Sequence, residues 1–169
     1  MGTHNRLLRL GDATYLEVIA INPAAPPPGR SRWFDFDGLA PDAAPRLATW
    51  VVRTGDIQST VTASREELGA IERMSRGTLS WRITVREDGT LPFDGVMPSL
   101  IEWDTDLHPC ARLQDRGCRF VSIEAGHTAA ARISRSLESI CLVGRVAIAP
   151  AEWPHLTATV ETPAGLRTL

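Results

Sequence analysis

The segment at residues 78–85, TLSWRITV, decides the fold class because apolar and polar residues alternate along it. Successive side chains of a β-strand point to opposite faces of a sheet, so this alternation predicts a strand with one apolar face. That face carries Leu79, Trp81, Ile83 and Val85, and the other carries Ser80, Arg82 and Thr84. A Glu87-Asp88-Gly89 turn follows, and residues 99–103 predict a second short strand.

A strand and a helix are expected before this pair. Residues 47–53 are mostly apolar and predict a strand. Asp56 can cap a helix, because its carboxylate accepts hydrogen bonds from free backbone amides, and that helix would carry Ile57, Val61 and Leu68. Residues 47–110 are therefore expected to form a module in the order strand, helix, strand, strand.

A further, divergent module is expected at residues 111–169, so that residues 47–110 are the second module of the chain and residues 111–169 the third. Residues 118–125 predict a strand, and residues 128–142 predict a helix whose apolar stripe carries Ile133, Leu137, Ile140 and Cys141. Further strands are predicted at residues 146–149, 156–161 and 166–169.

The first 46 residues are expected to form a hairpin and a long connection. Residues 5–10 and 14–21 predict two strands joined by a Gly11-Asp12 turn. Residues 22–45 are rich in Pro and Ala and predict an irregular connection. Its Trp33, Phe34 and Phe36 are too apolar for a free linker, so we expect them to anchor it against the body of the domain.

The two hairpins resemble each other. Gly2-Thr3 opens a hairpin that ends in Leu16-Glu17-Val18, and Gly77-Thr78 opens one that ends in Ile101-Glu102-Trp103. Residues 1–46 are therefore interpreted as a partial first module with its connection. The 169 residues are expected to form one domain of modules packed side by side.

The composition excludes several classes of function. The net charge of −2 does not provide the basic surface that nucleic acid requires. All 18 basic residues are arginine, which excludes mechanisms that need a lysine. The chain lacks the motifs GxGxxG, GxxxxGKS/T and GxSxG, so no nucleotide cofactor is expected.

The sequence also predicts a cytoplasmic location. No apolar run approaches the roughly 20 residues that span a bilayer, so no membrane partner is expected. The N-terminus lacks the apolar core of a signal peptide. The three cysteines, Cys110, Cys118 and Cys141, are odd in number and lack a CxxC spacing, so we expect three reduced thiols.

Five segments together resemble a known family. They are residues 2–8 (GTHNRLL), residues 15–20 (YLEVIA), Trp81-Arg82, residues 100–104 (LIEWD) and His108-Pro109. They are similar to the glyoxalase-like domain family of the vicinal oxygen chelate superfamily. The resemblance implies an α+β fold in which βαβββ modules form an incomplete barrel of mixed and antiparallel strands, with the helices on its outer face. Members include lyases, isomerases, ring-cleaving dioxygenases and non-catalytic drug-binding proteins.

One departure from the family predicts self-association. The family's first module opens with a strand, a helix and a strand before the Gly-Thr pair, and this sequence lacks that piece. Without an opening strand, one edge of the sheet has no partner, and a second chain can cover it. We therefore expect a homodimer, in which strands can be exchanged between the subunits.

The resemblance also implies where a divalent metal ion would bind. Metal-dependent members place ligands at the start of the first strand and on the last strand of each module, which puts Glu17 and Glu102 at last-strand positions. The opening-strand position of the second module falls near Trp50, which cannot bind a metal. Two carboxylates without an imidazole are a poor ligand set for zinc, nickel or iron, so a metal ion at Glu17 and Glu102 stays an open alternative.

Both glutamates are also catalytic candidates without the resemblance. Each lies in an apolar strand, where an unpaired buried carboxylate is costly. One alternative is a structural ion pair with Arg6 or Arg82. The other is that Glu17 and Glu102 face one cleft, where one of them acts as a general base.

A further set of residues is expected to contact a small-molecule substrate. Arg82 would bind an anionic group, and the tryptophans would stack on the ligand. The set comprises His4, Asn5, Arg6, Trp50, Trp81, Arg82, Trp103 and His108. Three functions stay open: an enzyme of the lyase, isomerase or dioxygenase type acting on a small oxygen-rich metabolite, a non-catalytic small-molecule binding protein, and an incomplete domain without activity.

Overall fold

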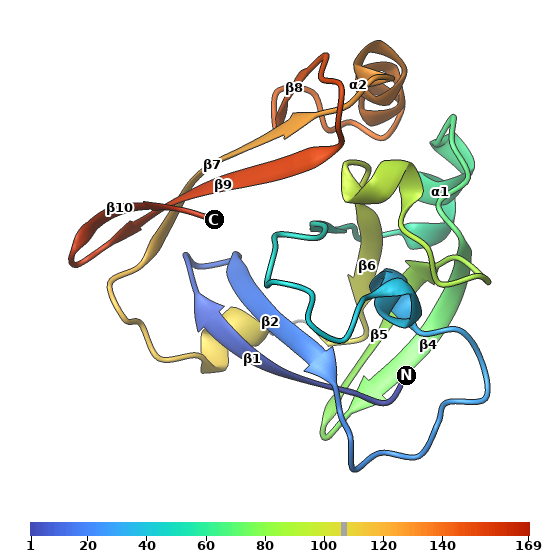
Figure 1. Ribbon diagram of the computed structural model, residues 1–169, viewed down its shortest axis with the longest axis vertical. Helices are drawn as coiled ribbons and strands as arrows, with labels where there is room; N and C mark the ends of the chain where they lie inside the picture. The colour runs from blue at the N-terminus through green and yellow to red at the C-terminus, as the bar shows by residue number, and fades with distance from the viewer. Residues whose placement is uncertain (106–107) are drawn as a thin grey trace.

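The computed structural model describes residues 1–105 and 108–169 (Figure 1). Within them the chain is an α+β protein with three sheets that do not close into a barrel, so the predicted fold class is confirmed. The first sheet is the antiparallel hairpin of β1 (Thr3–Arg9) and β2 (Tyr15–Ile21). In the described part of the chain, no helix is both long and apolar enough to cross a membrane.

The second sheet contains the segment that predicted the fold. Its strands, in spatial order, are β3 (Val51–Arg53), β6 (Ser99–Trp103), β5 (Leu79–Val85) and β4 (Ala70–Arg76). β3 runs parallel to β6, whereas β5 is antiparallel to β6 and β4. The helix α1 (Ile57–Ala63) follows β3, and Asp56 caps it as predicted, since its carboxylate accepts a hydrogen bond of 3.0 Å from the backbone N–H of Ser59.

Two details of this sheet differ from the prediction. β4 was not predicted, because its apolar Ile71 and Met74 are three residues apart and do not alternate. It forms at the edge of the sheet by pairing with β5 along its whole length. The strand expected at residues 47–53 pairs only from Val51 onward. With β4 included, the elements follow the order β, α, β, β, β.

The third sheet has a different order. Its strands, in spatial order, are β10 (Gly165–Thr168), β9 (His155–Thr162), β7 (Arg119–Gly126) and β8 (Ala147–Ala149). In the second sheet the last strand of the module lies beside the first, whereas here the third strand, β9, lies beside β7. The helix α2 (Ala130–Ser139) is shorter than predicted, because Cys141 has a left-handed backbone with φ of 60°. Cys141 is therefore exposed, and its expected place on the apolar stripe was wrong.

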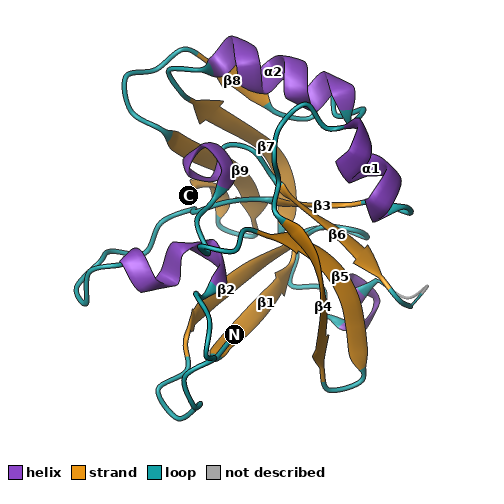
Figure 2. Ribbon diagram, turned by 90° about the vertical axis from the view of Figure 1, so that its right-hand side faces the viewer, coloured by secondary structure: helices purple, strands orange, loops and turns teal. Residues whose placement is uncertain are grey.

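The second sheet separates two apolar cores. The helix-side core joins α1, α2, β6 and β7 and includes Ile57, Met97, Leu100, Ile133 and Leu137. Figure 2 shows both helices along one side of the molecule, opposite the β1–β2 hairpin. The pocket-side core comprises Trp33, Phe36, Trp81, Ile83, Val85 and Ile101. Trp33 and Phe36 belong to the 3-10 turn η1 (Trp33–Gly38), so the proline-rich connection is anchored as predicted.

Arg132 holds the third sheet against the second. Arg132 on α2 donates two hydrogen bonds of 2.7 Å to the carboxylate of Glu66, which precedes β4. Its guanidinium also lies 5.2 Å from the ring centroid of Phe93, in the 3-10 turn η2 (Pro92–Gly95). Phe93 in turn contacts the ring of His127, which follows β7. These contacts fix α2 against the second sheet.

The β1–β2 hairpin leads to a prediction about assembly. A two-stranded sheet is marginal by itself, and in the described residues neither strand pairs with a third. Val18 on its outer face is 64% exposed. We predict that two subunits associate through this hairpin and that light scattering gives twice the 18.5 kDa mass of one chain. A monomer at high protein concentration would contradict this prediction.

Candidate functional site

A cavity of about 110 Å³ lies between the β1–β2 hairpin and the second sheet. It is large enough for a small molecule rather than a single water. Its lining combines five aromatic rings with a few polar groups. The lining residues are Asn5, Leu7, Tyr15, Glu17, Trp33, Phe34, Val51, Arg76, Leu79, Trp81, Ile83, Ile101, Trp103 and Pro109.

The register of β5 and β6 decides which residues reach this cavity. Trp81 lies opposite Trp103 and Ile83 lies opposite Ile101, and all four line the cavity. Arg82 and Glu102 form the pair between them. Because adjacent residues of a strand point to opposite faces, that pair lies on the other side of the sheet.

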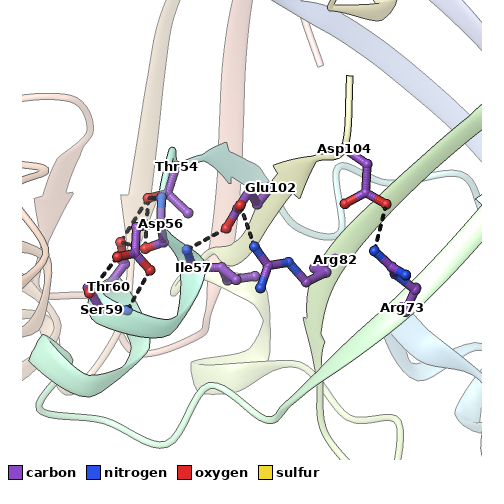
Figure 3. A network of polar contacts seen from close by, with 9 residues as sticks. All are labelled: Thr54, Asp56, Ile57, Ser59, Thr60, Arg73, Arg82, Glu102 and Asp104. Atoms are coloured by element: carbon purple, nitrogen blue, oxygen red, sulfur yellow. Dashed lines mark hydrogen bonds and ion pairs between the residues drawn. The ribbon is translucent and has the colours of Figure 1, made fainter. Parts of the chain in front are cut away.

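Glu102 therefore performs a structural role on the helix side. One oxygen of its carboxylate, Oε2, accepts a hydrogen bond of 2.7 Å from the backbone N–H of Ile57, at the first turn of α1, and Oε1 pairs with Arg82 (Figure 3). The first backbone N–H groups of a helix lack partners within the helix, so this carboxylate satisfies one of them. Glu102 and Glu17 do not face one cavity, whereas the expected ion pair with Arg82 is present.

Glu17 occupies the corresponding place in the first hairpin but has different neighbours. In the β1–β2 hairpin, Glu17 lies opposite Leu7. In the second sheet, by contrast, Glu102 lies opposite Arg82. Its carboxylate accepts a short hydrogen bond from the side-chain amide of Asn5. Among the described residues, no basic side chain lies within ion-pair distance of Glu17. In the described part of the chain, the Glu17 carboxylate therefore has no ion-pair partner and accepts its hydrogen bond from a neutral amide.

Tyr15 and His108 extend the polar end of the cavity. The ring of Tyr15 lies 5.6 Å from that of His108, which lies 6.3 Å from that of Trp103. Burial raises the pKa of the Tyr15 phenol, and the nearby charge of Glu17 raises it further. Burial, with a smaller contribution from Arg53, lowers the pKa of His108. Both groups are therefore held in their neutral forms.

Phe34 forms a wall of the cavity in an unusual backbone conformation. Phe34 and Asp35 have φ of 59° and 57°, in the left-handed region, which costs roughly 1–2 kcal/mol per residue. The turn is held by a hydrogen bond of 2.8 Å from the Asp35 N–H to the carbonyl of Gly89. Arg32 and Asp37 pair across the same turn at 2.6 Å. The position of this ring is thus fixed by the fold before any ligand binds.

Several residues expected at the substrate site lie elsewhere. His4 and Arg6 are exposed on the outer face of β1, because the inner face presents Asn5 and Leu7. Trp50 packs against the helix-side core, where its indole N–H donates to the carbonyl of Val96 at 2.8 Å. Of the other predicted residues, Asn5, Trp81 and Trp103 line the cavity, His108 lies beside it, and Arg82 lies outside it.

Sequence reasoning did not predict the contributions of Trp33, Phe34 and Arg76 to the cavity. Trp33 and Phe34 were expected to anchor the connection, because they are apolar residues within a proline-rich segment. That they also line the cavity depends on contacts between segments far apart in the sequence, which local patterns do not show. Arg76 lies at the end of β4, the strand that was not predicted.

The residues present do not fit a divalent metal ion. In residues 1–105 and 108–169, no three side chains of His, Cys, Asp or Glu come together as a ligand set. Of the described residues, Glu17 is the acidic one that lines the cavity, and Glu102 is held by Arg82 and α1. These residues do not assemble the donor set that a catalytic metal needs.

Comparison with known proteins was consistent with the fold. Residues 1–141 match the model of a family described as a glyoxalase-like domain. A crystal structure of a hypothetical protein from Staphylococcus aureus is similar, with a TM-score of 0.61 at 10% identity over 99% of this chain and 84% of that chain. At that identity the likeness concerns the fold alone. No curated protein matches the chain.

The structural role of Glu102 can be tested by substitution. Glu102→Ala leaves the buried N–H of Ile57 without its partner, so we expect the free energy of unfolding to fall by about 1–3 kcal/mol. The matched control is Arg73→Ala, which removes the pair with Asp104 at 3.4 Å from a side chain that is 75% exposed. Chemical denaturation should show a loss of less than about 1 kcal/mol for that variant. Equal losses in the two variants would contradict the assignment.

Tyr15 gives a direct readout of the cavity because it is the chain's one tyrosine. In the native protein its tyrosinate absorbance should develop well above the usual pKa of about 10, and in denaturant it should develop near that value. The unfolded chain then loses the proton first, so the free energy of unfolding should fall as the pH rises above about 10. Glu17→Gln should lower the native pKa. A native midpoint near 10 would show that Tyr15 is not buried beside Glu17.

Proposed function

Because the chain belongs to the family of glyoxalase-like domains, we propose that it binds a small organic metabolite in the cavity between the β1–β2 hairpin and the second sheet. This function corresponds to the binding-protein alternative from the sequence. One observation carries it: among the described residues, five aromatic rings and a single carboxylate line one cavity of about 110 Å³.

The chemistry of the lining supports ligand binding. Ligand sites are typically apolar with a few placed polar groups. Here three of them, Asn5, Tyr15 and Glu17, lie on β1 and β2, and Arg76 lies at the end of β4. Asn5, Tyr15 and Glu17 can exchange hydrogen bonds with the oxygen atoms and hydroxyl groups of a metabolite. The tryptophans of β5 and β6, with Trp33 and Phe34, would cover its apolar body.

A second candidate function is metal-independent proton transfer. Glu17 and Tyr15 are two residues apart on β2, so both side chains point to the same face and into the same cavity. The carboxylate of Glu17 would accept a proton from the substrate. Tyr15, kept protonated by burial, would donate a hydrogen bond to an oxygen that becomes negative. Turnover lost in Glu17→Gln with binding retained would favour this candidate.

Binding can be tested with phenol, a small planar probe that carries one hydroxyl. We expect phenol to bind, and Trp103→Leu to weaken binding at least tenfold because a wall of the cavity is lost. The control is Trp153→Leu, because Trp153 is 74% exposed and does not line the cavity. Isothermal titration calorimetry measures both variants. Unchanged affinity in Trp103→Leu, or an equal loss in Trp153→Leu, would overturn the proposed site.

A further inference from the structure

From the charge and the aromatic lining of this cavity, we infer that it selects ligands with a positively charged head group, a quaternary ammonium or a protonated amine. The inference rests on the proposed function, since it names the class of molecule that the same cavity prefers. It stands on two independent features: the unneutralised carboxylate of Glu17 and the arrangement of the aromatic rings.

Glu17 supplies a negative charge inside the cavity. The partner of its carboxylate is the neutral amide of Asn5. Its counterpart Glu102 shows the alternative, because there an arginine lies directly opposite and pairs with the carboxylate. Opposite Glu17, the place that Arg82 takes opposite Glu102 is occupied by the apolar side chain of Leu7. A cationic ligand would complete the pair.

The aromatic lining contains two pairs of rings in contact. The ring centroids of Trp81 and Trp103 lie 5.3 Å apart, with their planes inclined by 49°. The ring centroids of Trp33 and Phe34 lie 5.1 Å apart, and these two rings stack on each other at 19°. Ring faces carry negative charge and attract cations, and an ammonium group with several methyl groups can contact several faces at once. A cavity lined by several aromatic rings and a carboxylate therefore favours a cation over an anion.

Arg76 is the one basic residue that lines the cavity within the described part of the chain, and it opposes this preference. Its side chain is exposed, and its guanidinium donates a hydrogen bond of 3.4 Å to the backbone carbonyl of Thr3. Glu17 is partly buried, so water and salt screen the field of its carboxylate less than that of the exposed Arg76 guanidinium. The negative field of Glu17 therefore dominates within the cavity, and Arg76 should weaken cation binding only modestly.

The experiment compares choline with its uncharged analogue, in which a carbon atom replaces the nitrogen. The two molecules have nearly the same shape, so a difference in affinity reports the charge. We expect titration calorimetry to show choline binding at least tenfold more tightly than the analogue. Glu17→Gln should remove most of that preference and leave binding of the analogue unchanged. Arg76→Gln should strengthen choline binding severalfold without affecting the analogue.

The inference would be overturned by equal affinities for the two probes, by a preference that persists in Glu17→Gln, or by the absence of choline binding. Should phenol still bind in a way that depends on Trp103, the proposed function would stand and only the preference for cations would fall. Should none of the three probes bind, both would fall. Far-ultraviolet circular dichroism of each variant confirms that the fold is retained.

Discussion

The structure depends on the alternation of side chains across the pairing of β5 with β6. In this register Trp81 faces Trp103 on one side of the sheet, while Arg82 faces Glu102 on the other. A shift of one residue would reverse both faces of a strand. It would move Trp103 into the helix-side core and Glu102 into the cavity. The aromatic wall and the anchor of α1 are therefore two results of one constraint, and neither can change without the other.

Glu17 and Glu102 lie in different strand pairs and differ in role because they lie on different sides of their sheets: Glu17 lines the cavity, whereas Glu102 lies on the helix side. The residues opposite them differ as well, with Arg82 opposite Glu102 and Leu7 opposite Glu17. Glu102 has a structural role, since its carboxylate pairs with Arg82 and accepts a hydrogen bond from the first turn of α1. Glu17 lies beside the aromatic rings of the cavity. Of these two carboxylates, one therefore has a structural role, and the other, at Glu17, lies in the cavity without an ion-pair partner among the described residues.

Local patterns predicted much of the fold and part of the site. The strand at residues 78–85 and the helix cap at Asp56 were predicted, because each depends on a pattern of a few adjacent residues. β4 was missed because it forms only by pairing with β5. The alternation already placed Glu102 and Trp103 on opposite faces, but the sequence does not show which face borders the cavity. That depends on where the hairpin and η1 dock, which involves contacts between residues more than forty positions apart in the sequence.

The most direct test of the account uses the indole N–H signals of the chain's five tryptophans in a nitrogen–proton correlation spectrum. Three of them line the cavity, Trp33, Trp81 and Trp103, whereas Trp50 and Trp153 do not. Phenol, the probe of the proposed site, is the ligand of the titration. The account predicts that the signals of Trp33, Trp81 and Trp103 shift together and saturate with one affinity, while those of Trp50 and Trp153 do not shift. Shifts confined to Trp50 or Trp153, with the three cavity signals unmoved, would contradict it.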